Sequence, residues 1–420
     1  MIDTILDLFR RLRERWGRFS AVGKMSCVLA VVVLVCATVK YLPGISTFTT
    51  YFNQASPEAQ TAILGVVLVI CLVSVIAAYD RMSRADELKA ALKHARADVE
   101  KYRQEAGSLQ ERWDRLLEVE SREQLWQRPC KAAVPQFVGP GRRTTRFLTM
   151  LNLKGGVGKT TLTANLAAIL ALDHGIRVLL VDIDFQGTLS DAAVDKQFIQ
   201  LQCNNRNTID RLLAPAECDG QVMQLAVPMN AVPGARVILA DDRLEAEDYS
   251  LQARFFVDPA KEVRFFFRHH FHRPSVFGQF DLVVFDCPPR LTTSTVNALA
   301  CSDAVIIPTK LDPGSVNAVP RTIDWLISLS GVVPARLIGV VANQAAVRVG
   351  ALTKADRNSY TYLQSVVAQR CPGQDVVFKA VVSASPKAIS AAQGLVASVK
   401  DEGREVYRPL VEELKTRLQL

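Results

Sequence analysis

A glycine-rich run between an apolar strand and a helix most narrows what this chain can fold into. The run is Lys154-Gly-Gly-Val-Gly-Lys-Thr-Thr161, and it directly follows Phe147-Leu-Thr-Met-Leu-Asn152. Glycines let the backbone approach an anion closely, and the positive end of the following helix adds to the field. The lysine of such a run reaches terminal phosphates, and the adjacent hydroxyl suits Mg²⁺. The predicted phosphate cradle consists of Gly155, Gly156, Val157, Gly158, Lys159, Thr160 and Thr161.

Short apolar runs alternate with amphipathic helical segments from Arg143 onward. Continuous apolar strands separated by helices favour a mostly parallel sheet that is covered by helices on both faces. The predicted fold class is therefore α/β, a P-loop nucleotide-binding domain over residues 144–420. Its predicted strands are 147–152, 178–182, 281–286, 304–308 and 337–342.

Four ordered motifs resemble the ParA/MinD family of ATPases, and ParA proper more closely than MinD. Residues 152–167 resemble the family's deviant Walker A motif with its first helix, and residues 182–187 resemble its switch segment. Residues 286–289 resemble the Walker B strand end, and residues 295–299 the helix beyond it. The resemblance covers residues 145–415 and implies an ATPase that uses ATP and Mg²⁺.

The resemblance also implies roles for individual side chains. Lys154 would cross an ATP-sandwiched dimer to touch the partner's phosphates. Asp184 would position the attacking water, and Asp182 would support the switch. Asp286 would hold Mg²⁺ together with Thr160. The implied catalytic set is Lys154, Lys159 and Asp184.

Asn343 follows an apolar strand and resembles the family's adenine-reading asparagine, although a turn-forming asparagine fits the same place. Two positions depart from the expected patterns. Leu153 stands where the strict P-loop has its first glycine, which together with Lys154 indicates the deviant form. Phe185 stands where the family's switch normally has proline.

Two long apolar runs precede this domain. Residues 25–39 and residues 61–78 contain no charged side chain, and the loop between them, 42–60, contains no Lys or Arg. With basic residues outside both runs, the positive-inside rule places both ends in the cytoplasm. We therefore predict a two-helix transmembrane hairpin over 22–79, in a bacterial inner membrane, with the ATPase domain cytoplasmic. A cleaved signal peptide is the alternative for the first run, but it lacks a small-x-small cleavage site.

Two further segments complete the predicted organisation. Residues 1–21 read as a basic amphipathic helix in the membrane interface, or as an ordinary surface helix. Residues 80–128 read as a coiled coil, or as a lone amphipathic helix, and residues 129–143 as a linker rich in Pro and Gly. The heptad seam is Ala85, Leu88, Leu92, Ala95, Val99, Tyr102, Ala106, Leu109, Trp113 and Leu116.

The net charge of +8 fits either nucleic acid or anionic lipid as a partner. DNA would meet exposed basic residues, although such charges are more often a solvated face. The candidates are Arg348, Lys354, Arg357, Lys379, Lys387 and Lys400. His269-His-Phe-His272 is predicted to be a solvated basic turn rather than a metal site, since no acidic or Cys partner is placed nearby.

The functional hypothesis that unites these features is a membrane-anchored ATPase. ATP would close a dimer through Lys154, and the closed dimer would recruit or position a partner at the inner membrane. An unidentified activating protein would stimulate slow hydrolysis. Two alternatives stay open: a DNA-associated partition-type ATPase, and a membrane-associated, tyrosine kinase-like regulator of polysaccharide export.

Overall fold

The chain divides into two units in the computed structural model, Met1–Glu118 and Val119–Leu420. The residues that it describes are 56–60, 93–105, 107–108, 122–130, 133–214, 220–348, 350–384 and 401–420. The predicted amphipathic helix 1–21 and the two apolar runs of the predicted hairpin lie outside them.

Within these described ranges, no helix is long and apolar enough to cross a membrane. The physical reason is charge: the 18-residue helix α19 (Asp401–Leu418) carries charged side chains along its whole length. This finding corrects the prediction of an inner-membrane protein with two transmembrane helices.

The first unit contains helical residues at 57–60, 93–105 and 107–108. Ala95, Val99 and Tyr102 are the half-buried residues of the stretch 93–105, and the residues between them are exposed. Their spacing of four and three places them on one helical face. The coiled coil stays a prediction, since a second helix against this face is not part of the described chain.

The second unit begins with a segment that the sequence assigned to the end of the rod and to the linker. Leu125 and Trp126 of α6 (Arg122–Trp126) are buried, and the Trp126 ring stacks on Phe255 with centroids 5.9 Å apart. A short 3₁₀ turn, η2 (Pro140–Arg142), then leads into the first strand. The described residues between 122 and 143 therefore belong to the same unit as the sheet.

A seven-stranded sheet in the order β3-β4-β2-β5-β1-β6-β7 forms the centre of this unit. Every neighbouring pair is parallel except β3 and β4. The strands are β1 (Arg146–Met150), β2 (Val178–Asp182), β3 (Val227–Pro228), β4 (Ala235–Ile238), β5 (Leu282–Asp286), β6 (Ala304–Thr309) and β7 (Arg336–Ala342). The α/β class and the five predicted strands are confirmed; β3 and β4 were not predicted.

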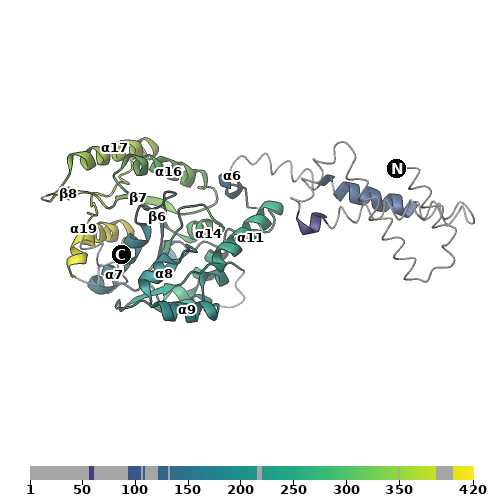
Figure 1. Cartoon of the computed structure of the whole chain (residues 1–420), viewed down its shortest axis with the longest axis horizontal. Helices are drawn as coiled ribbons and strands as arrows, with labels where there is room; N and C mark the ends of the chain where they lie inside the picture. The colour runs from purple at the N-terminus through teal and green to yellow at the C-terminus, as the bar shows by residue number, and fades with distance from the viewer. Residues whose placement is uncertain are drawn as a thin grey trace, which may run out of the picture. The chain divides into compact units, whose positions relative to one another are not determined.

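Helices cover both faces of the sheet (Figure 1). Successive strand residues point to opposite faces, and all five residues of β2 and of β5 are buried. One face packs against α7 (Lys159–His174), α8 (Thr188–Ala193) and α19. The other packs against α11 (Arg243–Val257), α12 (Phe266–Phe271), α14 (Thr293–Cys301), α16 (Ala318–Ser328) and α17 (Lys354–Arg370).

The remaining elements are short. They are α9 (Lys196–Asn204), η3 (Ile209–Leu212), α10 (Gln221–Leu225), α13 (Pro274–Phe277), α15 (Pro313–Val316), β8 (Val347–Arg348) and β9 (Ala351–Leu352). Because β1, β2, β5 and β6 are parallel, their carboxyl ends meet at one edge of the sheet. The strand order reverses around β1, and ligands of open α/β sheets bind at such a point.

Candidate functional site

The glycine-rich loop connects β1 to α7 at this carboxyl edge. Gly156 and Gly158 have φ of +72° and +84°, in the left-handed region that favours glycine. Asn343, at the end of β7, donates its Nδ2–H to the Val157 carbonyl at 2.9 Å. A Cβ on Gly158 would lie 2.4 Å from the same Nδ2. Asn343 therefore braces the loop, and its contact with adenine stays a prediction.

A second asparagine fixes the start of the loop. The Asn152 side chain is buried; its Nδ2–H donates to the Pro308 carbonyl at 2.7 Å. Its Oδ1 accepts the Lys154 N–H at 2.9 Å. These bonds tie the loop to β6, so both of its ends are held by neighbouring strands. A cradle held in this way loses little conformational freedom when it binds a ligand.

Lys159 begins α7 and is only 7% exposed. Its Nζ donates to the Lys154 carbonyl at 3.4 Å, which is a long bond for an ammonium. Burial lowers the pKa of Lys159, and the charges of Asp286, Cys287 and Asp184 oppose that shift. A buried ammonium aimed at a loop of this kind needs an anionic partner to offset its desolvation.

Asp182 and Asp286 end the adjacent strands β2 and β5 in direct register, and both are fully buried. Burial raises the pKa of Asp182 to about 7, and repulsion from Asp286 adds to the rise. Burial likewise raises the pKa of Asp286 to about 6, against the opposing effects of the Thr160 hydroxyl and of Lys159. Two carboxyl groups that disfavour ionisation at one strand edge are typical of a functional site.

The surroundings of Asp286 fit a magnesium ion. Its Oδ2 is buried without a hydrogen-bond partner among the described residues, and its Oδ1 is 3.4 Å from the Thr163 hydroxyl. Carboxylate and hydroxyl oxygens are the ligands that Mg²⁺ prefers. Across the described part of the chain, no cluster of three or more His, Cys, Asp or Glu could hold a metal alone. Nucleotide phosphates and water would have to complete the ion's coordination.

Asp182 has a different environment from Asp286, because its oxygens have partners. Its Oδ2 accepts both the Ser190 N–H and the Ser190 hydroxyl at 2.8 Å, and its Oδ1 accepts the Asp184 N–H at 3.1 Å. The Ser190 oxygen also accepts the Ala240 N–H at 3.1 Å. The structure thus anchors the Asp184 segment to the loop after β4 through Ser190, a residue that sequence reasoning missed.

Asp184 lies in the loop after β2, half-buried, with its Oδ1 accepting the Gln186 N–H at 3.1 Å. Its charge raises the pKa of both Lys159 and Asp286. The carboxylate is therefore close enough to the cradle to affect both groups. Its role in orienting water stays a prediction.

Lys154 points away from the cradle, toward the loop after β6. Its Nζ lies 3.6 Å from Asp312 Oδ1, and the two side chains are 36% and 48% exposed. Asp312 caps α15 by accepting the Ser315 N–H at 2.9 Å. The Ser315 hydroxyl bond lowers the pKa of Asp312 most, and Lys154 lowers it further. The side chain of Lys154 is therefore open to solvent, whereas Lys159 is buried.

Parts of this chain are similar in sequence to known proteins. A family model described as "AAA domain" matches residues 145–329. The sporulation initiation inhibitor protein Soj of Bacillus subtilis is 28% identical over 275 residues, covering 64% of this chain and 98% of Soj. The chromosome partitioning protein ParA of Caulobacter vibrioides is 29% identical over 280 residues, covering 65% of this chain and 94% of that ParA. The second unit is therefore similar in sequence to Soj and ParA, and we call it the ParA-like domain.

Two solved structures show the same fold as this ParA-like domain. Apo McdA from Cyanothece aligns with a TM-score of 0.52 and 20% identity, over 65% of this chain and 99% of McdA. Cobyrinic acid a,c-diamide synthase from Mycobacterium smegmatis, with an ATP analogue and magnesium, aligns with a TM-score of 0.50 and 22% identity, over 66% and 96%.

The chain spans about half the length of the first curated relatives that it matches. These are two uncharacterised proteins of Mycobacterium tuberculosis, each 32% identical over 191 residues. The aligned residues make up 44% of this chain and 53% of each relative. The similarity therefore does not by itself assign an activity, substrates or partners to this chain.

The histidine run of the ParA-like domain is not a solvated turn, and that prediction is wrong. His270 is 3% exposed and contacts the Ala214 carbonyl through Nε2 at 2.8 Å. His272 accepts the Val138 N–H on Nδ1 at 3.1 Å and contacts the Cys301 carbonyl through Nε2 at 2.8 Å. Burial lowers the pKa of His272 to about 3, so the ring is neutral with its proton on Nε2.

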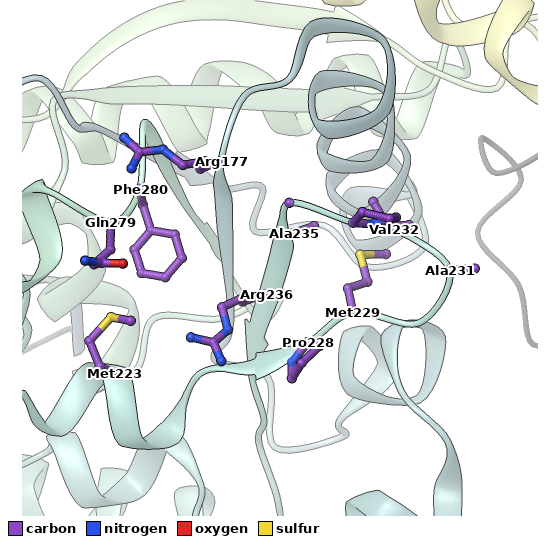
Figure 2. A pocket seen from close by; sticks show the side chains of 12 residues that line it. Arg177, Met223, Pro228, Met229, Ala231, Val232, Ala235, Arg236, Gln279 and Phe280 are labelled. Carbon is purple, nitrogen blue, oxygen red and sulfur yellow. The ribbon is translucent and has the colours of Figure 1, made fainter.

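A cavity of about 460 Å³ lies at the other edge of the sheet. Figure 2 shows Met223, Phe280, Arg177 and Arg236 on its walls. Arg177 directly precedes β2, and Arg236 lies in β4 near its start. Since these strands are parallel to β5, the cavity is at their amino ends, and the cradle is at their carboxyl ends. The cavity is therefore separate from the candidate nucleotide site.

Proposed function

We propose that this chain is an ATP-dependent molecular switch that binds ATP with Mg²⁺ at the Gly155–Thr161 cradle and hydrolyses it slowly. One observation carries the proposal: Lys159 is buried at the carboxyl edge of the sheet together with Asp286, whose Oδ2 has no hydrogen-bond partner among the described residues. The buried ammonium of Lys159 suits the negative phosphates of a magnesium nucleotide, and the buried carboxyl of Asp286 suits its Mg²⁺. The magnesium nucleotide in the synthase structure of the same fold supports this assignment.

The proposed chemistry is phosphoryl transfer to water, in which positioning and charge supply most of the catalysis. Lys159 neutralises the terminal phosphates, and the loop N–H groups orient them. Thr160 and Asp286 hold the Mg²⁺, which offsets charge that develops on the phosphates. Asp184 orients the attacking water, and Asp182 keeps the Asp184 loop in place through its bonds to Ser190 and to the Asp184 N–H.

We propose a dimer because Lys154 is accessible. Its ion pair with Asp312 is half-exposed at 3.6 Å, and such pairs contribute little, about 0–1 kcal/mol. The lysine can therefore leave Asp312 for the phosphates of a second subunit at small cost. Hydrolysis removes the terminal phosphate, so the dimer opens and the switch resets.

An activating protein and DNA are proposed as partners. The relatives named chromosome partitioning proteins support DNA. So does the exposure of Arg348, Lys354 and Arg357, which lie on the β8–β9 hairpin and the first turn of α17. Nonspecific DNA binding should weaken steeply as salt is raised.

Two lysine variants test the switch. Lys159→Ala should weaken ATP binding on the order of 100-fold, since charge-assisted bonds contribute about 1.5–3 kcal/mol each. Lys154→Ala should retain ATP binding but lose the ATP-dependent dimer in analytical ultracentrifugation. Lys196→Ala, an exposed lysine at the start of α9, is the matched control. Unchanged ATP affinity in Lys159→Ala would refute the cradle, and an unchanged dimer in Lys154→Ala would refute the switch.

A further inference from the structure

Arg290 connects the two loops that carry the acidic residues of the cradle. It lies four positions after Asp286, in the loop that follows β5. Its guanidinium carbon is 4.4 Å from the centroid of the Phe185 ring, which belongs to the loop after β2. Its Nη2 donates to Glu245 Oε1, in the first turn of α11, at 3.0 Å. One side chain therefore links its own loop to two other segments around the site.

The geometry suits arginine in particular. A planar guanidinium can stack on an aromatic face while its edge donates to a carboxylate, and an ammonium cannot do both in the same way. The 4.4 Å separation is well within the range of a cation–π contact. Arg290 and Glu245 are each 35% exposed, so water weakens their ion pair, and the stacking on Phe185 is the more informative contact.

The support behind Arg290 is firm. On α11, one turn after Glu245, Asp248 accepts the Ser294 N–H at 2.7 Å and the Ser294 hydroxyl at 2.8 Å. The Arg290 carbonyl itself accepts the Thr295 hydroxyl at 3.1 Å. All three bonds reach the first turn of α14. The backbone of Arg290 and the helix that carries Glu245 are thus tied to α14, and Phe185 lies on a loop.

Phe185 directly follows Asp184, the residue proposed to orient water. The backbone here is held by the Asp184 N–H bond to Asp182 and the Gln186 N–H bond to Asp184. The family's switch normally has proline where Phe185 stands, and proline fixes φ near −65° by its ring. Phenylalanine supplies no such restraint, so a contact made by its side chain can take that role.

We infer that Arg290 is a positioning residue that clamps Phe185 and thereby keeps Asp184 facing the cradle. The inference rests on the proposed ATPase function. Loss of the clamp spreads Asp184 over more orientations, which slows the hydrolytic step and leaves nucleotide binding unchanged. Arg290 touches neither the cradle lysine nor Asp286 in this role; it acts only through Phe185.

The test uses the full chain and separates binding, turnover and loop motion. Arg290→Ala and Phe185→Leu should each lower kcat about fivefold to tenfold, with the Kd for ATP within twofold of wild type. Phe185→Trp keeps an aromatic face and should retain at least half of the wild-type kcat. Arg236→Ala, at the amino edge of the sheet, is the control and should change neither value.

Hydrogen exchange without nucleotide gives a second readout that does not depend on activity. The amides of Gln186 and Gly187 should exchange several-fold faster in Arg290→Ala and Phe185→Leu than in wild type, because their hydrogen bonds to Asp184 open more often. Unchanged exchange and unchanged kcat in both variants would overturn the clamp. If Arg290→Ala fails to fold, Phe185→Leu against Phe185→Trp decides. A wild-type chain that binds no ATP would refute the proposed function, and the exchange data would still decide the clamp.

Discussion

Two regions of the ParA-like domain contain buried charged groups, and they differ in how many hydrogen-bond partners those groups have. We call Arg143, Arg264, Arg268, Phe137, Phe147, Phe255, Phe265 and His272 the arginine–aromatic cluster. There Arg264 is fully buried and donates to Glu262 at 2.6 Å, to the Trp126 carbonyl at 2.9 Å and to the Arg128 carbonyl at 2.6 Å. At the carboxyl edge, Lys159 has one long bond and Asp286 Oδ2 has no partner among the described residues.

The difference indicates which region is structural. A buried charge with a full set of partners has its desolvation offset within the protein. A buried charge that lacks partners is offset only when a ligand arrives, so it marks a binding site. The arginine–aromatic cluster holds the backbone at Trp126, Arg128 and Val138 against the core, and the carboxyl edge is where we propose that a magnesium nucleotide binds. Both regions have shifted pKa values, so a shift alone does not distinguish them.

Breaking the cluster should have the largest effect on stability. Arg264→Met leaves Glu262 as a buried charge without its partner, and the two side chains are 0% and 7% exposed. Losing one member of a buried pair costs about 3–5 kcal/mol, so the free energy of unfolding should fall by that amount in urea titrations. ATP affinity of the folded fraction should not change.

The double variant Glu262→Gln with Arg264→Met is the control for that measurement. It removes the orphaned charge and should recover a large part of the loss. If Arg264→Met lowers the free energy of unfolding by less than about 1 kcal/mol, then the charges of the cluster are not offset by partners within the protein. The two regions would then no longer differ.

Asp286→Asn should have the opposite effect on stability. A carboxyl whose folded pKa is raised stabilises the fold below its unfolded pKa, and that contribution is lost as pH rises through the folded value. For Asp286 the loss runs from about pH 4 to pH 6. At pH 7.5 the asparagine variant should therefore exceed wild type by about 1–3 kcal/mol without nucleotide.

Two measurements check this reading of Asp286. The gain of Asp286→Asn over wild type should disappear by pH 4, where both proteins carry a neutral side chain. Stabilisation of wild type by ATP should increase with Mg²⁺, and that of the variant should not. A variant that is less stable than wild type at pH 7.5 would mean that Asp286 has a partner within the protein.

Much of the fold and part of the site follow from the sequence. Strong local patterns predict the five long strands, the loop and the acids at the strand ends, because apolar runs and glycines act over a few residues. Ser190, Arg290 and the burial of His270 were not predictable in this way. Each depends on a contact distant in sequence, such as Ser190 with Ala240 or His270 with Ala214.

The prediction of the membrane hairpin depended on hydropathy and on the placement of basic residues, and the localisation drawn from it did not hold among the described helices. The end of the predicted coiled coil and the predicted linker, 129–143, show why local patterns mislead. Arg264 binds the carbonyls of Trp126 and Arg128, and His272 binds the N–H of Val138. Backbone hydrogen bonds to distant side chains leave no trace in hydropathy or periodicity.

His272 gives the smallest predicted effect and the sharpest comparison with Asp286. Its folded pKa of about 3 lies below the usual 6.5, so the neutral ring stabilises the fold above pH 6.5, and that contribution is lost as pH falls. At pH 5.5 the loss should be about 1.4 kcal/mol. His272→Gln removes the titration, so between pH 7.5 and 5.5 its unfolding free energy should fall by that much less than that of wild type.

Lowering the pH should therefore stabilise the fold through Asp286 and destabilise it through His272. Unfolding of wild type, Asp286→Asn and His272→Gln in urea at pH 7.5 and pH 5.5 isolates the two contributions. If removing the two residues changes the pH slope in the same direction, burial is not the main cause of both pKa shifts, because burial raises the pKa of an acid and lowers that of a histidine. An internal partner would then offset the charge of one of the two groups, and the contrast between Asp286 and His272 would fail.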